Sequence, residues 1–204
     1  MPRDQALNER MRAESQARII TAARKLFAER GYFSCKVSDI AREAGMSTGN
    51  VYWYYPGKED VLRAVLADGL GAHEALLAQA AAHPGTSREK LDYLLERYLR
   101  FCHEQGEFFA VLISILGHGG VPDLEQLGFD MREIGQAYHR HLTSIIAQGQ
   151  AEGAVLDAEP NALAMLFFSL FNGLLLTYGE DWHMLPLDAI KAGVLRLLGV
   201  RQLR

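Results

Sequence analysis

At 204 residues with 49% hydrophobic side chains, the chain has ample material for a packed core, which excludes a mainly disordered protein. Its net charge of -4 is unevenly divided, because residues 1–60 hold 10 Lys and Arg against 8 Asp and Glu, while residues 61–204 hold 11 against 17. The basic excess therefore lies in the N-terminal part, where contact with phosphate groups would need it.

The compartment is indicated by the cysteines and the N-terminus. Cys35 and Cys102 lie far apart, and the first residues contain no apolar run of the signal-peptide type. We therefore expect a reduced, cytoplasmic protein. The longest apolar stretch, residues 162–178, includes Asn172 and falls short of the roughly 20 residues that a membrane span requires. We expect it to be a buried interface helix with no membrane association.

The N-terminal segment predicts a polar arm followed by a helix. Residues 1–13 show no clear core-facing periodicity and are expected to form a mobile arm or a loosely held helical extension. Apolar residues then recur at spacings of three and four from Ile19 to Phe27, which predicts a helix from about Glu14. Gly31 is expected to end it, in the position after the last helical residue that glycine favours.

Two shorter helices are predicted next, separated by a tight turn. Residues 37–44 indicate a two-turn helix, and Gly45 permits the turn because glycine adopts positive φ without a Cβ clash. Ser47 is a good N-cap for the following helix, since its hydroxyl accepts an otherwise orphan backbone N–H. Pro56 is expected to end that helix.

The rest of the chain also predicts helices, separated by glycine- and proline-containing turns. The expected ranges are 58–83, 87–105, 108–116, 123–152, 159–178 and 186–198. We find no persuasive strand and no internal repeat. The sequence therefore predicts an all-α fold with about nine helices.

Residues 19–66 carry a family pattern without a gap. The matching residues are Ile20, Ala23, Leu26 and Phe27, then Gly31 and Tyr32, then Val37, Asp39, Ile40, Ala41, Ala44 and Gly45, and finally Ser47, Gly49, Tyr52, Pro56, Lys58 and Glu59. This set resembles the N-terminal domain of the TetR family of bacterial transcriptional regulators. The resemblance implies a three-helix DNA-binding domain with a helix-turn-helix and a C-terminal helical domain for ligand binding and dimerisation.

The resemblance also implies a division of the chain. We place the N-terminal arm at residues 1–13 and the DNA-binding domain at 14–74, with the helix-turn-helix at 36–55. Residues 75–204 are then the effector-binding and dimerisation domain. The arginines of the arm lie where they could also reach DNA phosphates.

Phosphate contacts are expected from three residues. Tyr52 can donate its phenolic hydroxyl, and Lys58 lies in the first turn of a helix, where backbone N–H groups already favour anions. Lys36 departs from the family pattern, which usually has a threonine that caps the following helix and touches phosphate. Because Lys36 cannot cap as a hydroxyl does, we expect Asp39 to accept from the orphan N–H groups and Lys36 to supply a phosphate charge.

Sequence readout needs side chains aimed at base edges. The expected readers are Ser38, Thr48, Asn50, Trp53 and Tyr54. One helix cannot bury all of residues 51–55, so some must be exposed. We expect Val51 and Tyr55 in the core, and an exposed Trp–Tyr pair that asks for a partner.

The resemblance implies that the C-terminal half forms a homodimer. The helix of residues 159–178 is apolar nearly all round, which a two-layer monomer cannot fully bury. We therefore expect a subunit interface built from helices near 159–178 and 187–198, with Gly173 allowing close approach. A dimer would place two recognition helices about one DNA turn apart, roughly 34 Å, so the double-stranded DNA operator is expected to be a near-palindrome.

The resemblance further implies an effector, expected to be a small apolar or aromatic molecule among the middle helices. The candidate residues are Phe101, His103, Phe108, Leu112, His118, Tyr138, His141, Phe168 and Asn172. The alternative for each aromatic side chain is ordinary core packing, and for each histidine an exposed or internally satisfied ring. Ligand-relieved repression requires that the effector bind the DNA-incompetent form more tightly.

Other function classes find little support in the sequence. The run Gly117–Gly120 is similar to an oxyanion-hole loop, but no Gly-x-Ser-x-Gly elbow accompanies it. His139 and His141 point to different helix faces, and no Cys-x-x-Cys motif exists. We therefore expect no enzyme activity, no cofactor and no metal. The alternative function is a small-molecule binding or carrier protein, or an all-α enzyme, with a non-functional DNA reader.

Overall fold

The computed structural model describes residues 2–117, 123–179 and 181–200. Within these ranges it contains nine α-helices, one short 3-10 helix and no strand, which confirms the expected all-α fold. Contacts divide the chain into two compact units, Met1–Gly69 with Ala110–Gly128 and Leu70–Phe109 with Phe129–Arg204. The sequence did not indicate that residues 110–128 belong with the N-terminal unit.

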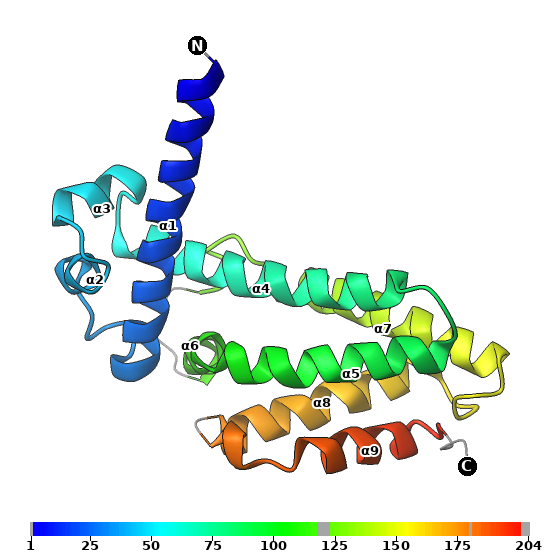
Figure 1. Ribbon diagram of the computed structural model, residues 1–204. Coiled ribbons are helices and arrows are strands. Elements are labelled where there is room, and N and C mark those ends of the chain that lie inside the picture. The colour runs from blue at the N-terminus through cyan, green and yellow to red at the C-terminus, as the bar shows by residue number, and fades with distance from the viewer. Residues whose placement is uncertain (1, 118–122, 180, 201–204) are drawn as a thin grey trace. The chain divides into compact units, whose positions relative to one another are not determined.

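The first unit is built around the long helix α1. Its helices are α1 (Pro2–Arg30), α2 (Val37–Glu43), α3 (Thr48–Tyr54), the first part of α4 (Lys58–Ala82) and the second part of α6 (Gly106–Gly117) (Figure 1). Since α1 begins at Pro2, the expected arm is a helical extension. Ile19, Leu26 and Phe27 are at most 2% exposed, as their helical spacing predicts.

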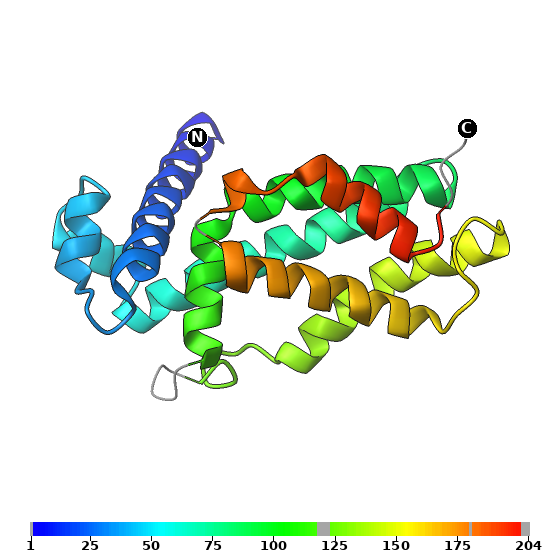
Figure 2. The same ribbon diagram turned by 90° about the horizontal axis from the view of Figure 1, so that it is seen from below.

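The second unit is a bundle with a large aromatic core. It contains α5 (Ser87–Glu104), α7 (Met131–Ala151), α8 (Pro160–Tyr178), the 3-10 helix η1 (Trp182–Met184), α9 (Leu187–Leu197) and the remaining parts of α4 and α6. Helix α8 packs along α7, and α5 contacts both α7 and α9 (Figures 1 and 2). Trp182, Tyr98, Phe108 and Phe171 are among the largest fully buried side chains, so these helices enclose the core.

One predicted helix begins later than expected. The sequence pattern placed its start at residue 123, but α7 begins at Met131. Gly128 has φ +86°, which breaks a helix, and Asp130 then caps α7 by accepting from the backbone N–H groups of Arg132 at 2.8 Å and Glu133 at 3.1 Å. The apolar side chains of 124 and 127 are buried but belong to a turn.

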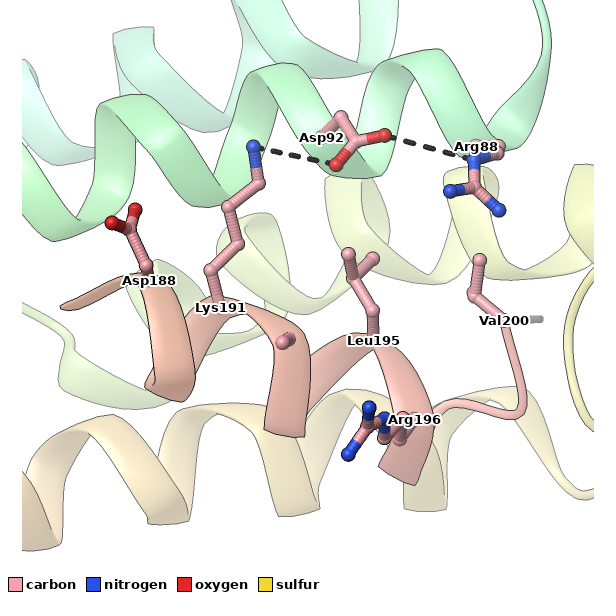
Figure 3. Close-up of a pocket in the computed structure, with 8 residues that line it drawn as sticks. Arg88, Asp92, Asp188, Lys191, Leu195, Arg196 and Val200 are labelled. Atoms are coloured by element: carbon pink, nitrogen blue, oxygen red, sulfur yellow. Dashed lines mark ion pairs between the residues drawn. The ribbon is translucent and has the colours of Figure 1, made fainter. Parts of the chain in front are cut away.

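Helix α9 lies against α5 through apolar packing and one ion pair. Lys191 Nζ is 3.3 Å from Asp92 Oδ1, and the other oxygen of Asp92 faces Arg88 Nε at 3.8 Å (Figure 3). A hollow of about 210 Å³ beside the pair is lined by Arg88, Asp92, Asp188, Lys191, Ala192, Leu195, Arg196 and Val200. Such partly exposed pairs contribute about 0–1 kcal/mol each, so burial of Val194 and Leu195 is the larger contribution.

The end of α7 is fastened to the start of α5. The Glu152 carboxylate accepts from the backbone N–H of Ser87 at 2.9 Å and from its hydroxyl at 2.6 Å. These hydrogen bonds lower the pKa of Glu152. Gly149 allows this close approach, because a Cβ added there would lie 2.3 Å from Val155 Cγ2 and 2.9 Å from Ser87 Oγ.

Gly149→Ala is expected to lower the free energy of unfolding by about 1–3 kcal/mol, because the added methyl overpacks this corner. Gly135→Ala is the matched control on the same helix, since a Cβ there meets nothing within 4 Å. The control is expected to raise stability by roughly 0.5–1 kcal/mol through helix propensity. Urea denaturation of both variants measures the difference, and equal stabilities would contradict the assignment of Gly149 to close packing.

Candidate functional site

Helices α2 and α3 form a helix-turn-helix whose turn is fixed by local hydrogen bonds. Gly45 takes φ +64° in the turn, and the guanidinium of Arg18 on α1 donates to the carbonyl of Ala44. Ser47 Oγ accepts from the backbone N–H of Asn50 at 3.1 Å, which confirms Ser47 as the N-cap of α3. The start of α3 is therefore tied to α1 and to its own first turn.

The side chains of α3 divide between core and solvent as the sequence predicts for Val51, Tyr55 and Trp53, but Tyr54 is less exposed than expected. Val51 is 0% and Tyr55 9% exposed, so both belong to the core. Tyr52 is 51% and Trp53 69% exposed, whereas Tyr54 is half-buried with its ring 4.6 Å from that of Trp53. Four of the other expected DNA contacts are exposed: Lys36, Ser38, Thr48 and Asn50. This unit therefore presents polar and aromatic groups together on one short helix and its neighbour.

A contact with α1 at this surface is absent from the sequence reading. The guanidinium carbon of Arg12 lies 5.5 Å from the centroid of the Trp53 ring, which is within the range of a cation–π interaction. Arg10, two residues earlier, instead pairs with Glu14 at 2.9 Å. No spacing rule relates residue 12 to residue 53, because their proximity depends on how α1 packs against the helix-turn-helix.

The start of α2 is capped from one side. The backbone N–H of Lys36 donates to Asp39 Oδ2 at 3.1 Å, as expected, and this hydrogen bond is the main cause of the lowered pKa of Asp39. The Lys36 side chain makes no cap hydrogen bond. Cys35, the other departure from the family pattern, is 1% exposed and its thiol donates to the carbonyl of Leu26 at 3.3 Å. Cys35 therefore serves the core, and Lys36 extends into solvent.

The structure corrects the expectation that Lys58 is available to phosphate. Its ammonium donates to the carbonyls of Tyr32 at 2.8 Å and Cys35 at 2.9 Å, with Phe33 at 3.5 Å, and it lies 4.2 Å from the Tyr32 ring centroid. Partial burial lowers the pKa of this ammonium. Lys58 thus ties the segment before α2 to α4, so its charge is used inside the unit. The first-turn position of Lys58 gave no signal of this fold-back.

In the second unit, the buried polar group at the centre of the aromatic core is His73. Its side chain is 7% exposed, and Nε2 is buried without a hydrogen-bond partner among the described residues. Burial lowers its pKa to about 4, so the imidazole is uncharged at neutral pH. The rings within 6.3 Å of its centroid belong to Tyr98, Phe101, Phe109, Tyr138 and Phe168. The sequence reading missed His73, whose place in an apolar helix gave no motif.

The expected effector residues separate into those near His73 and those away from it. Phe101, Tyr138 and Phe168 surround the imidazole, and Phe108 packs on Phe109 at 5.2 Å. His103 and Asn172 are exposed, His141 is half-buried, and Leu112 lies in the other compact unit. His103, His141 and Asn172 are not among the side chains whose rings surround His73, so the expected residues of the second unit do not all gather at this cluster. His118 lies outside the described residues.

The outer face of α8 is apolar and exposed. Leu163, Phe167 and Phe171 point inward, whereas the exposed large side chains of this helix are Met165, Leu166, Leu170, Leu176 and Tyr178. By length and composition α8 could cross a membrane, a test that core helices of soluble proteins also pass, and 33% of its most apolar window is buried. Asn172 and Gly173 lie on this exposed part of the helix. Large exposed apolar faces of this kind mark sites that bind an apolar partner surface.

Comparison with known proteins decides the family. The profile described as "Bacterial regulatory proteins, tetR family" matches residues 19–65, and the profile "Tetracyclin repressor-like, C-terminal domain" matches residues 84–180. Together they cover more than half of the chain. The chain belongs to the tetR family. The matched segments contain the helix-turn-helix and most of the second unit.

Individual relatives of this tetR-family chain extend over most of its length. It is 26% identical to the fatty acid metabolism regulator protein of Bacillus subtilis (strain 168) over 185 residues, which are 88% of this chain and 91% of the relative. The structure of FadR from Bacillus subtilis in complex with stearoyl-CoA is 25% identical, has a TM-score of 0.71 and covers 92% of this chain and 99% of that one.

A third similar structure is a transcriptional regulator from Saccharomonospora viridis in complex with choline. It is 20% identical, with a TM-score of 0.71, and covers 93% of this chain and 100% of that one. At that identity the likeness concerns the fold. The tetR-family profile and the two Bacillus subtilis relatives carry the functional conclusion. This tetR-family chain is a DNA-binding, ligand-responsive transcriptional repressor.

Lys36→Ala is expected to weaken operator binding and to reduce the slope of log K against log[salt] by about 0.9, the value for one phosphate contact. Arg132→Ala, an exposed arginine on α7 in the second unit, is the control and should leave the slope unchanged. Fluorescence anisotropy with operator DNA between 50 and 200 mM salt, roughly the range over which such contacts are resolved, makes the measurement. An unchanged slope in Lys36→Ala would remove this residue from the contact set.

The buried imidazole predicts a pH-dependent stability. The unfolded chain binds a proton at His73 near pH 6.5 and the folded chain only near pH 4, so stability is complete above pH 6.5 and is lost as the pH falls between these values. The loss amounts to about 3 kcal/mol. The phenols of Tyr98 and Tyr138, which face the ring, have raised pKa values and do not titrate in this window.

His73→Phe is expected to remove this component and flatten the profile between pH 6.5 and 4. Urea denaturation of both proteins at several pH values in this window measures the difference between their free energies of unfolding. Surface carboxylates titrate in both proteins, so their contribution cancels in that difference. Parallel profiles for the two proteins would contradict the prediction, because they would show that His73 has the same pKa in the folded and unfolded states.

Proposed function

We propose that this repressor binds a near-palindromic operator as a homodimer joined through α8 and α9, and that a fatty acyl thioester releases it. The observation that supports DNA reading most strongly is the exposure of Trp53, at 69%, beside Tyr52, at 51%, on a helix whose Val51 is buried and whose Tyr54 is half-buried. Large exposed aromatic groups are costly in water and are expected to meet a partner. The alternative, a carrier that has lost DNA recognition, would leave them without one.

The proposed DNA contacts have separate roles. Tyr52 donates its hydroxyl to a phosphate, and Lys36 supplies a phosphate charge. The residues proposed to face base edges are Ser38, Thr48, Asn50, Trp53 and Tyr54. Asn50 suits adenine through its amide, and Trp53 offers an apolar face to a thymine methyl. Lys58 acts indirectly, by holding the segment before α2 through the carbonyls of Tyr32 and Cys35.

The proposed dimer covers the exposed apolar face of α8. Leu166 is 66% and Leu176 69% exposed on this helix, and Leu197 of α9 is 69% exposed. A Cβ added at Gly173 meets nothing within 4 Å, so the backbone there is open to close approach by a second subunit. Burial of this face in a two-fold interface would remove the exposed large apolar side chains of both helices from water.

The proposed effector class is supported by the chemistry of the second unit and by its relatives. The His73 cluster is almost wholly aromatic and aliphatic, which suits an apolar chain. The relative from Bacillus subtilis is named for fatty acid metabolism, and the structure at 25% identity contains stearoyl-CoA. We assign the same ligand class to this chain.

Leu166→Glu is expected to raise the dissociation constant of the dimer about 30-fold or more, the equivalent of roughly 2 kcal/mol for a central interface residue. Operator affinity should fall with it, while helix content stays unchanged. Leu156→Glu, at an equally apolar residue that is 50% exposed outside α8 and α9, is the control. Light scattering after gel filtration measures the mass, and a Leu166→Glu protein that remains dimeric would place the interface elsewhere.

The effector proposal is tested on operator DNA selected from random sequence. Stearoyl-CoA is expected to release the protein from this DNA, whereas coenzyme A alone and choline are not, because neither carries an apolar chain. Electrophoretic mobility shift gives the fraction bound. Failure to select any DNA would favour the carrier alternative, and release by choline would refute the acyl class.

A further inference from the structure

The Nε2 atom of His73 is buried and has no hydrogen-bond partner among the described residues. Most buried polar groups in proteins have a hydrogen-bond partner, and an unpaired one destabilises the folded state. The described residues contain one other such atom, Nδ1 of His83, but that residue is only half-buried and stacks on Tyr93 at 4.5 Å. The neighbouring polar groups of the core are satisfied, since Tyr138 donates to Leu70 at 2.8 Å and Trp182 to Leu99 at 3.2 Å. Nε2 of His73 is therefore available to a ligand.

One of the five rings around His73, that of Phe168, also contacts a second imidazole, His139. The Phe168 ring lies 6.3 Å from the His73 ring at 73°, and on its other side it stacks on His139 at 5.1 Å and 30°. Phe168 is half-buried, unlike its neighbours Phe167 and Phe171, which are at most 3% exposed. Its contacts with the buried imidazole of His73 and the half-buried imidazole of His139 suit a movable gate.

His139 also lines a hollow at the surface of the same unit. This α7 hollow has a volume of about 490 Å³ and is lined by Gly135, Gln136, His139, Arg140 and Asn161. Arg140 places a guanidinium at this hollow. No Cβ fills the hollow at Gly135, because a Cβ added there meets nothing within 4 Å. The lining of the hollow is mostly polar, and through His139 it adjoins the aromatic ring of Phe168, a combination that fits an amphipathic molecule.

We propose that His73 is the hydrogen-bonding residue of the effector site, reached from the α7 hollow when the effector displaces the Phe168 ring. The ligand is an acyl thioester whose chain enters the aromatic cluster and whose carbonyl oxygen accepts from Nε2–H of His73. Its anionic head stays at the rim beside Arg140. This inference rests on the proposed function, because it identifies residues of the proposed acyl effector site.

The experiment uses full-length protein and two probes, stearoyl-CoA and S-octadecyl-CoA, the thioether that lacks the carbonyl. Binding is measured by calorimetry and release from operator DNA by mobility shift. The wild-type protein is expected to bind the thioester about tenfold more tightly than the thioether, the effect of one hydrogen bond. His73→Phe should bind the two equally, whereas His73→Gln, which retains a nitrogen donor near the position of Nε2, should recover part of the preference.

A separate experiment tests whether the effector enters through the α7 hollow. Gly135→Leu fills the α7 hollow and is expected to weaken stearoyl-CoA binding at least tenfold. Gly71→Leu is the matched control, because Gly71 is also an open helical glycine but is exposed on α4. Both variants should keep the wild-type circular dichroism and operator affinity, so that loss of ligand binding is not loss of fold.

The outcomes separate this inference from the proposed function. If stearoyl-CoA releases the wild type but His73→Phe keeps the thioester preference, or Gly135→Leu binds normally, the inference is wrong and the acyl effector stands. If the wild type neither binds stearoyl-CoA nor leaves the operator, both are wrong. A preference lost only in His73→Phe, with binding lost only in Gly135→Leu, supports both.

Discussion

The DNA-binding unit depends on the packing of two very short helices, α2 against α1 and α3 against α2. A helix of seven residues has too few hydrogen bonds to be stable by itself, so α2 and α3 keep their shape only through tertiary contacts. Ile40 and Val51 are each 0% exposed and attach one face of each helix to the core. Arg18 reaches from α1 to the turn between them. The positions of Thr48, Asn50 and Trp53 are therefore set by residues that never face DNA.

Lys58 connects the start of α4 to the segment between α1 and α2. A lysine next to a helix N-terminus is ordinarily a candidate for anion binding, but here its ammonium satisfies backbone carbonyls that follow α1. These carbonyls have no partner within a helix, so the lysine supplies what a capping residue would. The segment that contains Cys35 and Lys36 is thereby fixed to α4, and the position of Lys36 at the start of α2 depends on that attachment.

Features that depend on residues close together in the sequence could be predicted, and features that depend on residues far apart in the sequence could not. Local signals worked: the periodicity of residues 19–27, the positive φ of Gly45 and the Ser47 cap depend on neighbours along the chain. The start of α7 was misplaced because apolar periodicity continued into a turn that Gly128 and Asp130 terminate. His73 and the fold-back of Lys58 were missed because both depend on residues from distant helices, for which one sequence offers no rule.

The contact between Arg12 and Trp53 bears on how relatives of this chain are compared. Arg12 precedes residues 19–65, the part that matches the family profile, yet it touches the most exposed aromatic side chain of the reading helix. Two repressors with the same α3 sequence but different α1 extensions would hold that indole differently. Identity within the helix-turn-helix is therefore not sufficient to assign them a common operator.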